Sequence, residues 1–132
     1  MGFTGWPADL YSDRDVYKRQ VLCITADGGK EDEVKKAIQQ TVSYYGRLNV
    51  LINNAQNSAS GVSLVDHTQE DFDKAIYSGL YATFFYMKHA FPHLKESKGS
   101  VINFASGAGL SGRLGQSSYA AAKEGILSLI HI

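Results

Sequence analysis

Tyr119 and Lys123 are candidates for proton-transfer chemistry. They lie four residues apart in the segment Tyr-Ala-Ala-Ala-Lys, and on a helix this spacing places both side chains on one face. A free tyrosine has a pKa of about 10, but a neighbouring lysine cation stabilises its phenolate. The phenol can then donate a proton to a carbonyl or accept one from an alcohol. The pair alone is weak evidence, because the same spacing also occurs on solvated helix faces.

Ser106 strengthens this interpretation. It follows a predicted buried strand and precedes Tyr119 by thirteen residues, across a glycine-rich segment. In α/β proteins the loops at the carboxyl ends of strands face the ligand. A hydroxyl there could hydrogen-bond the reacting oxygen while Tyr119 moves the proton, although an ordinary turn serine fits the same position.

Asn53, Asn54 and Ala55 follow another predicted strand. Asparagine side chains at a strand end can cap backbone groups and hold neighbouring strands together. Ala55 is small enough to let a cofactor approach. Alone, this segment would be read as a plain loop.

The elements that must position these residues alternate between strand and helix. Apolar runs predict strands at 21–26, 48–53 and 100–105. Helical spacing of apolar residues predicts helices at 31–45, from 69 to about 77, at 79–97 and from 117 onward, the second opening with a capping box at Thr68–Asp71. Residues 106–116 are expected to form a mobile loop. The alternation predicts a parallel α/β sheet.

Composition excludes several classes of partner. The 132 residues carry 13 basic and 13 acidic side chains, a net charge of zero, which disfavours nucleic acid or an anionic membrane as partner. Apolar stretches are too short to span a bilayer, and no signal peptide is visible. The single Cys23 suits a reducing, cytoplasmic compartment. His89 and His93 have a metal-ligand spacing, but Pro92 between them favours a solvated face, so no metal is expected.

The two ends differ from the rest of the chain. Residues 1–20 show neither a strand nor a helical period, and residues 127–132 stop without a cap. We expect a genuine domain over 21–126, flanked by non-native residues that resemble translated adapter sequence. A native but disordered tail is the alternative for residues 1–20.

Four separated segments together resemble the short-chain dehydrogenase/reductase family. They are Asp27 after the first strand, 51–55, 102–109 and 119–123. The resemblance implies an incomplete Rossmann-like, doubly wound parallel sheet containing the third to fifth strands of the family order. It also implies an oxidoreductase that transfers a hydride between NAD or NADP and a small carbonyl/alcohol substrate.

The resemblance implies catalytic roles for Ser106, Tyr119 and Lys123. Ser106 would orient the substrate oxygen, and Tyr119 would be the general acid/base. Lys123 would contact the nicotinamide ribose and assist Tyr119 through its charge, so that Tyr119 and Lys123 also belong to the cofactor site.

Cofactor-binding roles are implied for residues at the ends of two strands. Asp27 would hydrogen-bond the adenine ring. Asn53 and Ala55 would line the adenosine side of the cofactor, and Asn54 would be mainly structural. We expect the full-length protein to form homo-oligomers through helices 79–97 and 117–132.

The chain departs from the family pattern in three ways. Gln56 replaces a usual glycine, and it joins Leu110 and Gln116 as a candidate pocket residue. Gly79 stands where an asparagine of the family often supplies a proton relay, and glycine has no side chain for that role. Three alternatives are open: a water takes over the relay, turnover is slower, or the chemistry differs. The glycine-rich turn that binds the pyrophosphate has no match before residue 27.

This third departure has an architectural consequence. The third and fourth strands are not neighbours in the order 3-2-1-4-5-6, so the 132-residue chain is expected to fold poorly and to be inactive. Two rival functions remain: a non-catalytic nucleotide-binding or regulatory relative, and an epimerase or dehydratase that also uses tyrosine and lysine.

Overall fold

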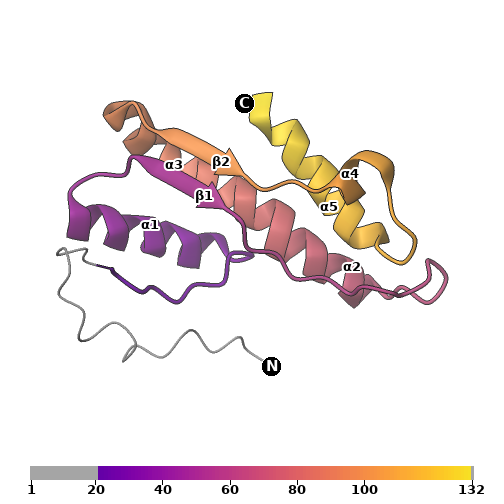
Figure 1. Ribbon diagram of the computed structural model, residues 1–132. Helices are drawn as coiled ribbons and strands as arrows, with labels where there is room; N and C mark the ends of the chain where they lie inside the picture. The colour runs from indigo at the N-terminus through magenta and orange to yellow at the C-terminus, as the bar shows by residue number, and fades with distance from the viewer. Residues whose placement is uncertain (1–20, 132) are drawn as a thin grey trace.

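A computed structural model describes residues 21–131 (Figure 1). The flank expected at 1–20 and the final residue 132 lie outside the described residues. The elements are α1 (Glu31–Tyr45), β1 (Val50–Asn53), α2 (Gln69–Ala75), the π-helical segment η2 (Ile76–Tyr81), α3 (Ala82–Ser97), β2 (Ser100–Asn103), α4 (Gly107–Ser111), α5 (Ser117–Ser128) and the 3-10 turn η3 (Leu129–His131). None of the helices in this part of the chain is long and apolar enough to cross a membrane.

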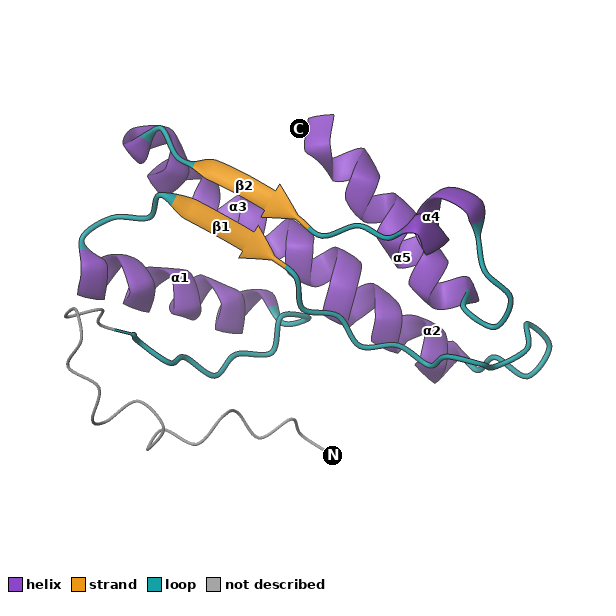
Figure 2. Ribbon diagram, viewed as in Figure 1, coloured by secondary structure: helices purple, strands orange, loops and turns teal. Residues whose placement is uncertain are grey.

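The sheet in the described residues has two parallel strands, β1 and β2, paired from Val50↔Ser100 to Asn53↔Asn103. The strand expected at 21–26 is wrong: these residues form a loop (Figure 2). A strand needs a hydrogen-bonded neighbour, and in the family order the third strand pairs with the second, for which the described residues contain no counterpart. The Leu22 N–H instead donates to the Tyr45 hydroxyl at 2.8 Å.

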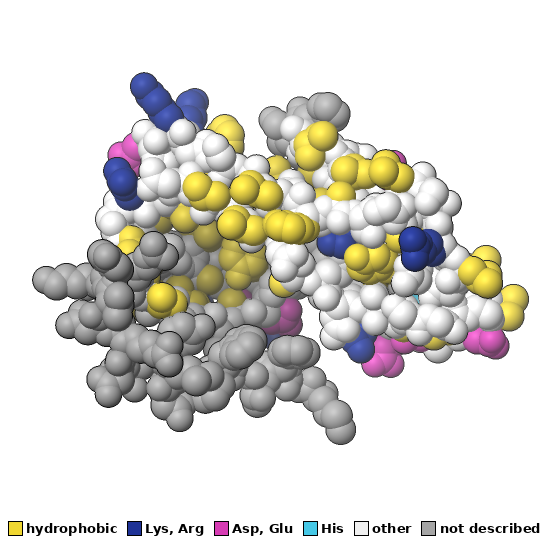
Figure 3. Space-filling model, in the orientation of Figure 1, with side chains coloured by type: hydrophobic (Ala, Val, Ile, Leu, Met, Phe, Trp, Pro, Cys, Tyr) yellow, Lys and Arg dark blue, Asp and Glu magenta, His cyan; other side chains and the backbone are white. Residues whose placement is uncertain are grey.

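The core lies between α1, α3 and one face of the sheet. Its buried members are Ile38, Leu51, Ala90 and Leu94. Apolar side chains on and next to the strands remain open to solvent, because no described element covers them. Val50, Ile52 and Ile102 on the strands and Phe104 just beyond β2 are all about half exposed. Figure 3 shows hydrophobic side chains gathered over the two strands.

Residues 69–97 form one continuous helical run rather than two separate helices. The expected capping box is present, with the Thr68 and Asp71 side chains each bonding the other's backbone N–H. The run passes through the π-helical segment η2 and continues as α3. Its first part, α2 and η2, packs against α5, whereas α3 packs against α1 and β1.

The segment 106–116, expected to be a loop throughout, contains the short helix α4. The Ser106 side chain caps it by accepting a hydrogen bond from the Ala108 N–H. Gly109 allows α4 to approach α5 closely, since a Cβ there would lie 2.8 Å from the Glu124 nitrogen. The cap and this contact stabilise a helix that apolar spacing alone does not predict in five residues.

Candidate active site

Helix α5 places Tyr119 and Lys123 together, as their spacing predicts. The Lys123 Nζ lies 5.8 Å from the centroid of the Tyr119 ring, within the range of a cation–π interaction. Tyr119 is half-buried and in the first turn of the helix. Lys123 is only 4% exposed. The phenol therefore stands beside a buried ammonium group.

Lys123 also connects α5 to the end of the sheet. Its Nζ donates a 2.6 Å hydrogen bond to the carbonyl of Phe104, immediately beyond β2. Burial lowers the pKa of Lys123, because the ammonium loses solvation. Within residues 21–131 this carbonyl takes one of the three ammonium protons, and the other two can donate to a ligand or to water.

Ser106 lies two residues after Phe104, at the start of α4. Its Oγ accepts from the Ala108 N–H at 3.2 Å, which leaves the hydroxyl proton free to donate elsewhere. Gly109, one helical turn on, packs against α5, where a Cβ would lie 3.2 Å from the Lys123 Cβ. The helix that begins at Ser106 thus contacts α5 at Lys123.

Asn53, Asn54 and Ala55 lie at the carboxyl end of β1. The Asn53 Nδ2 donates to the Asn103 Oδ1 at 2.8 Å, and the Phe104 N–H donates to the Asn53 carbonyl at 2.9 Å. Asn53 therefore ties the two strand ends together. Asn54 and Ala55 are exposed, so the sheet is open to a ligand at the carboxyl end of β1.

Asp27 forms the turn that precedes α1. Its Oδ1 accepts from the Gly29 N–H at 2.9 Å, and its own N–H donates to Glu33 at 2.7 Å. Its side chain is 54% exposed. Within residues 21–131, no hydrogen bond or ion pair joins Asp27 to Ser106, Tyr119 or Lys123.

The two substituted positions, Gln56 and Gly79, meet in the structure. A Cβ added to Gly79 would lie 2.6 Å from the Gln56 Cδ. The Gln56 amide is buried against η2. The other two candidate pocket residues are Leu110 and Gln116. Leu110 is 74% exposed, and Gln116 is half-buried.

His67 supports the site and was missed by sequence analysis. Its Nε2 lies 2.9 Å from the Ser118 Oγ, and Ser118 is completely buried next to Tyr119. The bond fixes the loop before α2 to the first turn of α5. No spacing rule connects residues 67 and 118, although His67 directly precedes the predicted capping box. Of the histidine pair at metal-ligand spacing, His89 contacts Glu31 at 2.9 Å.

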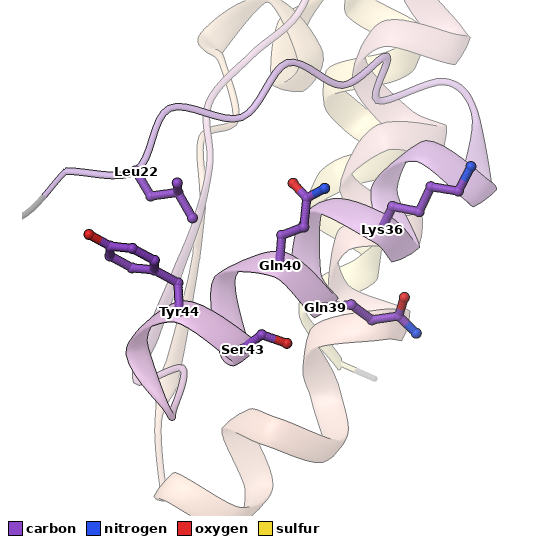
Figure 4. A pocket seen from close by; sticks show the side chains of 6 residues that line it. All are labelled: Leu22, Lys36, Gln39, Gln40, Ser43 and Tyr44. Carbon is purple, nitrogen blue, oxygen red and sulfur yellow. The ribbon is translucent and has the colours of Figure 1, made fainter.

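A cavity of about 540 Å³ lies away from these residues, between the loop at Leu22 and α1. Figure 4 shows its lining side chains, which include none of the candidate catalytic residues. The chemistry of the tyrosine–lysine pair, rather than cavity size, therefore locates the candidate site.

Comparisons with known proteins agree with this arrangement. A family model described as short chain dehydrogenase matches residues 9–132. A 12alpha-hydroxysteroid dehydrogenase from a Clostridium species is 59% identical over 109 residues, which cover 83% of this chain and 42% of that protein. The 3-oxoacyl-[acyl-carrier-protein] reductase FabG of Thermotoga maritima is 34% identical over 99 residues, 74% of this chain and 40% of the reductase.

A solved structure shows the same likeness. The structure of ElxO with NADP bound is 35% identical to this chain, with a TM-score of 0.74, and the match covers 78% of this chain and 42% of ElxO. The chain spans about two fifths of the length of the curated relatives it matches.

Proposed function

The chain belongs to the short-chain dehydrogenase family of oxidoreductases, and on that basis we propose that the full-length protein containing it transfers a hydride between NAD(P)(H) and a carbonyl/alcohol substrate. The observation that carries this proposal is the buried Lys123 ammonium beside the Tyr119 ring and bonded to the end of β2. A buried cation next to a phenol suits proton transfer to or from an oxygen.

Each of the three candidate residues then has a distinct task. In the reductive direction Tyr119 donates its hydroxyl proton to the carbonyl oxygen. Lys123 stabilises the phenolate that remains, through its charge. Ser106 donates its free hydroxyl proton in a hydrogen bond to the same oxygen and so orients the substrate. In the oxidative direction Tyr119 accepts the proton from the alcohol.

The exposure of residues at two places in the described structure supports a dinucleotide site. Asn54 and Ala55 are exposed at the carboxyl end of β1, and Asp27 offers a solvent-accessible carboxylate. We propose that Asp27, Asn53 and Ala55 hold the adenosine side, with Asn54 mainly structural. The spare Lys123 protons would hold the nicotinamide ribose. NAD or NADP supplies the hydride when bound.

The relatives favour a substrate class. A relative 59% identical to this chain is a 12alpha-hydroxysteroid dehydrogenase, so a hydroxysteroid is the first substrate to test. A 3-oxoacyl thioester is the second, because FabG is also a relative.

Replacement of Tyr119 tests the proposal directly. In the full-length protein, Tyr119→Phe should lower kcat by about 10²–10⁴-fold, the usual contribution of general acid/base catalysis. The measurement is NAD(P)H consumption with a ketosteroid. Tyr44→Phe is the matched control: Tyr44 lies on α1 and is 52% exposed, so turnover should not change.

Two outcomes would contradict the proposed reaction. Full turnover by Tyr119→Phe would remove the assigned acid/base. Binding of NAD(P) without turnover of either substrate by the unmodified protein would favour the non-catalytic, regulatory alternative.

A further inference from the structure

The first turn of α5, which carries Tyr119, has no side-chain cap of its own. Gln116 at the N-cap makes no capping hydrogen bond with its side chain. The Ser117 Oγ is buried and has no hydrogen-bonding partner among the described residues. Side-chain caps fix where a helix begins. The position of this turn, and of Tyr119 in it, therefore depends on contacts from outside the helix.

Two contacts from the loop after β1 supply that support. The Gly61 N–H donates to the Gly115 carbonyl at 2.9 Å, and a Cβ on Gly115 would lie 3.0 Å from the Gly61 Cα. The second contact is side chain to side chain, between the His67 Nε2 and the Ser118 Oγ at 2.9 Å. The loop thus holds the chain just before α5 and again within its first turn.

His67 is itself firmly placed. It directly precedes Thr68, the N-cap of α2, where the Asp71 N–H donates to the Thr68 Oγ1 at 3.1 Å and the Thr68 N–H donates to the Asp71 Oδ2 at 3.3 Å. This reciprocal capping fixes the backbone at the start of a helix, and α2 packs against α5. The imidazole therefore reaches α5 from a rigid support, whereas the start of α5 has none of its own.

The bond between His67 and Ser118 joins two buried groups. Ser118 is completely buried. The His67 Nδ1 has no partner in the described part of the chain, so Ser118 makes the one hydrogen bond of this imidazole there. A buried polar group that loses its partner is destabilised by its desolvation, so both side chains favour the bonded arrangement. Ser118 adjoins Tyr119, and consecutive Cα atoms are about 3.8 Å apart.

We propose that His67 is a positioning residue that, through Ser118, holds the first turn of α5 and so sets the place of the Tyr119 hydroxyl. The inference rests on the proposed function, since it takes Tyr119 as the acid/base. His67 does not touch the reacting atoms. It acts through the backbone that Ser118 shares with Tyr119.

The first test removes the polar imidazole. In the full-length protein, His67→Leu should lower kcat about tenfold with KM within about twofold, because a small displacement of the acid/base slows the reaction while the substrate contacts remain. His67→Gln should recover most of the loss, since its amide can hydrogen-bond Ser118. Unchanged kcat in His67→Leu, or equal losses in both variants, would overturn the proposal.

The matched control is His93→Leu. His93 is half-buried like His67 but lies near the end of α3, where it lines a hollow beside the end of α1. The same chemical change there should leave kcat and KM unchanged. A tenfold fall of kcat in His93→Leu would contradict a specific role for His67.

The second test approaches the same bond from α5. Ser118→Ala should lower kcat as much as His67→Leu. Alanine favours a helix over serine, so the loss would not come from a weaker α5. The double variant should lose no more than either single variant, since both remove one interaction. Additive losses would contradict a shared role.

A third measurement does not depend on turnover. The Ala120 N–H donates to the Gln116 carbonyl at 2.8 Å and closes the first turn of α5. Its hydrogen exchange, followed by NMR, should become about fivefold faster in His67→Leu. The Gly46 N–H, which donates to the Val42 carbonyl at the end of α1, should exchange at the same rate in both proteins.

This exchange separates the inference from the proposed function. If the protein turns over no carbonyl substrate, the proposed function fails, yet faster exchange at Ala120 still supports the hold of His67 on α5. Equal exchange at Ala120 in the parent and in His67→Leu would overturn that hold.

Discussion

Lys123 shows how one side chain can serve both the fold and the chemistry. The residue is 4% exposed, and its ammonium donates a hydrogen bond to the backbone carbonyl of Phe104. Burying a cation is costly unless it is paired or hydrogen-bonded. The same burial leaves the Lys123 charge poorly screened by water. Its electrostatic effect on the neighbouring Tyr119 ring is therefore strong.

The lowered pKa of Lys123 predicts a particular pH dependence of stability. Below the folded-state pKa of Lys123 the cation is present in both the folded and the unfolded protein. As the pH rises from that value towards the ordinary lysine pKa, the folded state releases its proton first. The unfolded state then holds more protons, so the free energy of unfolding increases.

Lys123→Met should lack this increase. Denaturant unfolding of the full-length protein and the variant across the alkaline range measures the difference. Titrations common to both proteins, such as that of the half-buried Tyr86, cancel in it. A constant difference between the two proteins at every pH would contradict the assigned cause.

Spacing rules could predict Tyr119 and Lys123 as a pair, because four residues on a helix fix their relation before any tertiary structure is known. The contact between Gln56 and Gly79 could not be predicted in this way. Positions 56 and 79 are brought together only by packing between a loop and a helix. The His67–Ser118 bond was missed for the same reason.

At the scale of elements, the junction between α3 and β2 depends on Gly99. Helix α3 is capped by Lys98 in a left-handed conformation, φ 55°, and the Gly99 N–H donates to the Leu94 carbonyl at 2.8 Å. The Gly99 Cα faces the backbone carbonyl of Asn49, just before β1, and a Cβ would overlap that carbonyl.

Gly99→Ala should therefore destabilise the full-length protein by about 1–3 kcal/mol, the usual cost of overpacking. Backbone atoms cannot move aside as the end of a side chain can. Gly107→Ala is the control, because a Cβ there meets nothing within 4 Å. Equal unfolding midpoints for Gly99→Ala and the parent in urea would show that the junction tolerates a side chain.

The prediction of elements succeeded where local signals sufficed. The helix at 31–45 and the capping box at Thr68–Asp71 both rest on neighbouring residues and were confirmed. The prediction of a strand at 21–26 was wrong. The apolar run there suits a strand, but a strand also needs a pairing partner from elsewhere in the chain. Helix α4 was missed because contact with α5 stabilises it.

At the scale of the molecule, the described elements cover only one face of the two-stranded sheet. One face packs on α1 and α3, whereas Val50, Ile52 and Ile102 on the strands remain about half exposed. Two strands rarely suffice for independent stability, and an exposed apolar face with unpaired edges favours association with other chains.

The isolated 132-residue chain should therefore self-associate as its concentration rises. Sedimentation velocity across a concentration series measures this, and Ile52→Lys combined with Ile102→Lys should reduce it by placing charge on the open face. Val65→Lys is the control, since Val65 is 91% exposed in a loop. A monomer at all concentrations would contradict the expected role of this face.

The π-helical segment η2 has a consequence for the angular phase of the whole run 69–97. A uniform α-helix keeps one fixed phase, so its apolar stripe follows a single line. The wider turns of η2, with i→i+5 bonding, rotate the direction in which the packed side chains point along the run. As a result α2 faces α5, whereas α3 faces α1 and β1. Losing one residue from 76–81 would rotate the two halves relative to each other. Gly79 would then turn away from Gln56 even if α3 kept its place in the core.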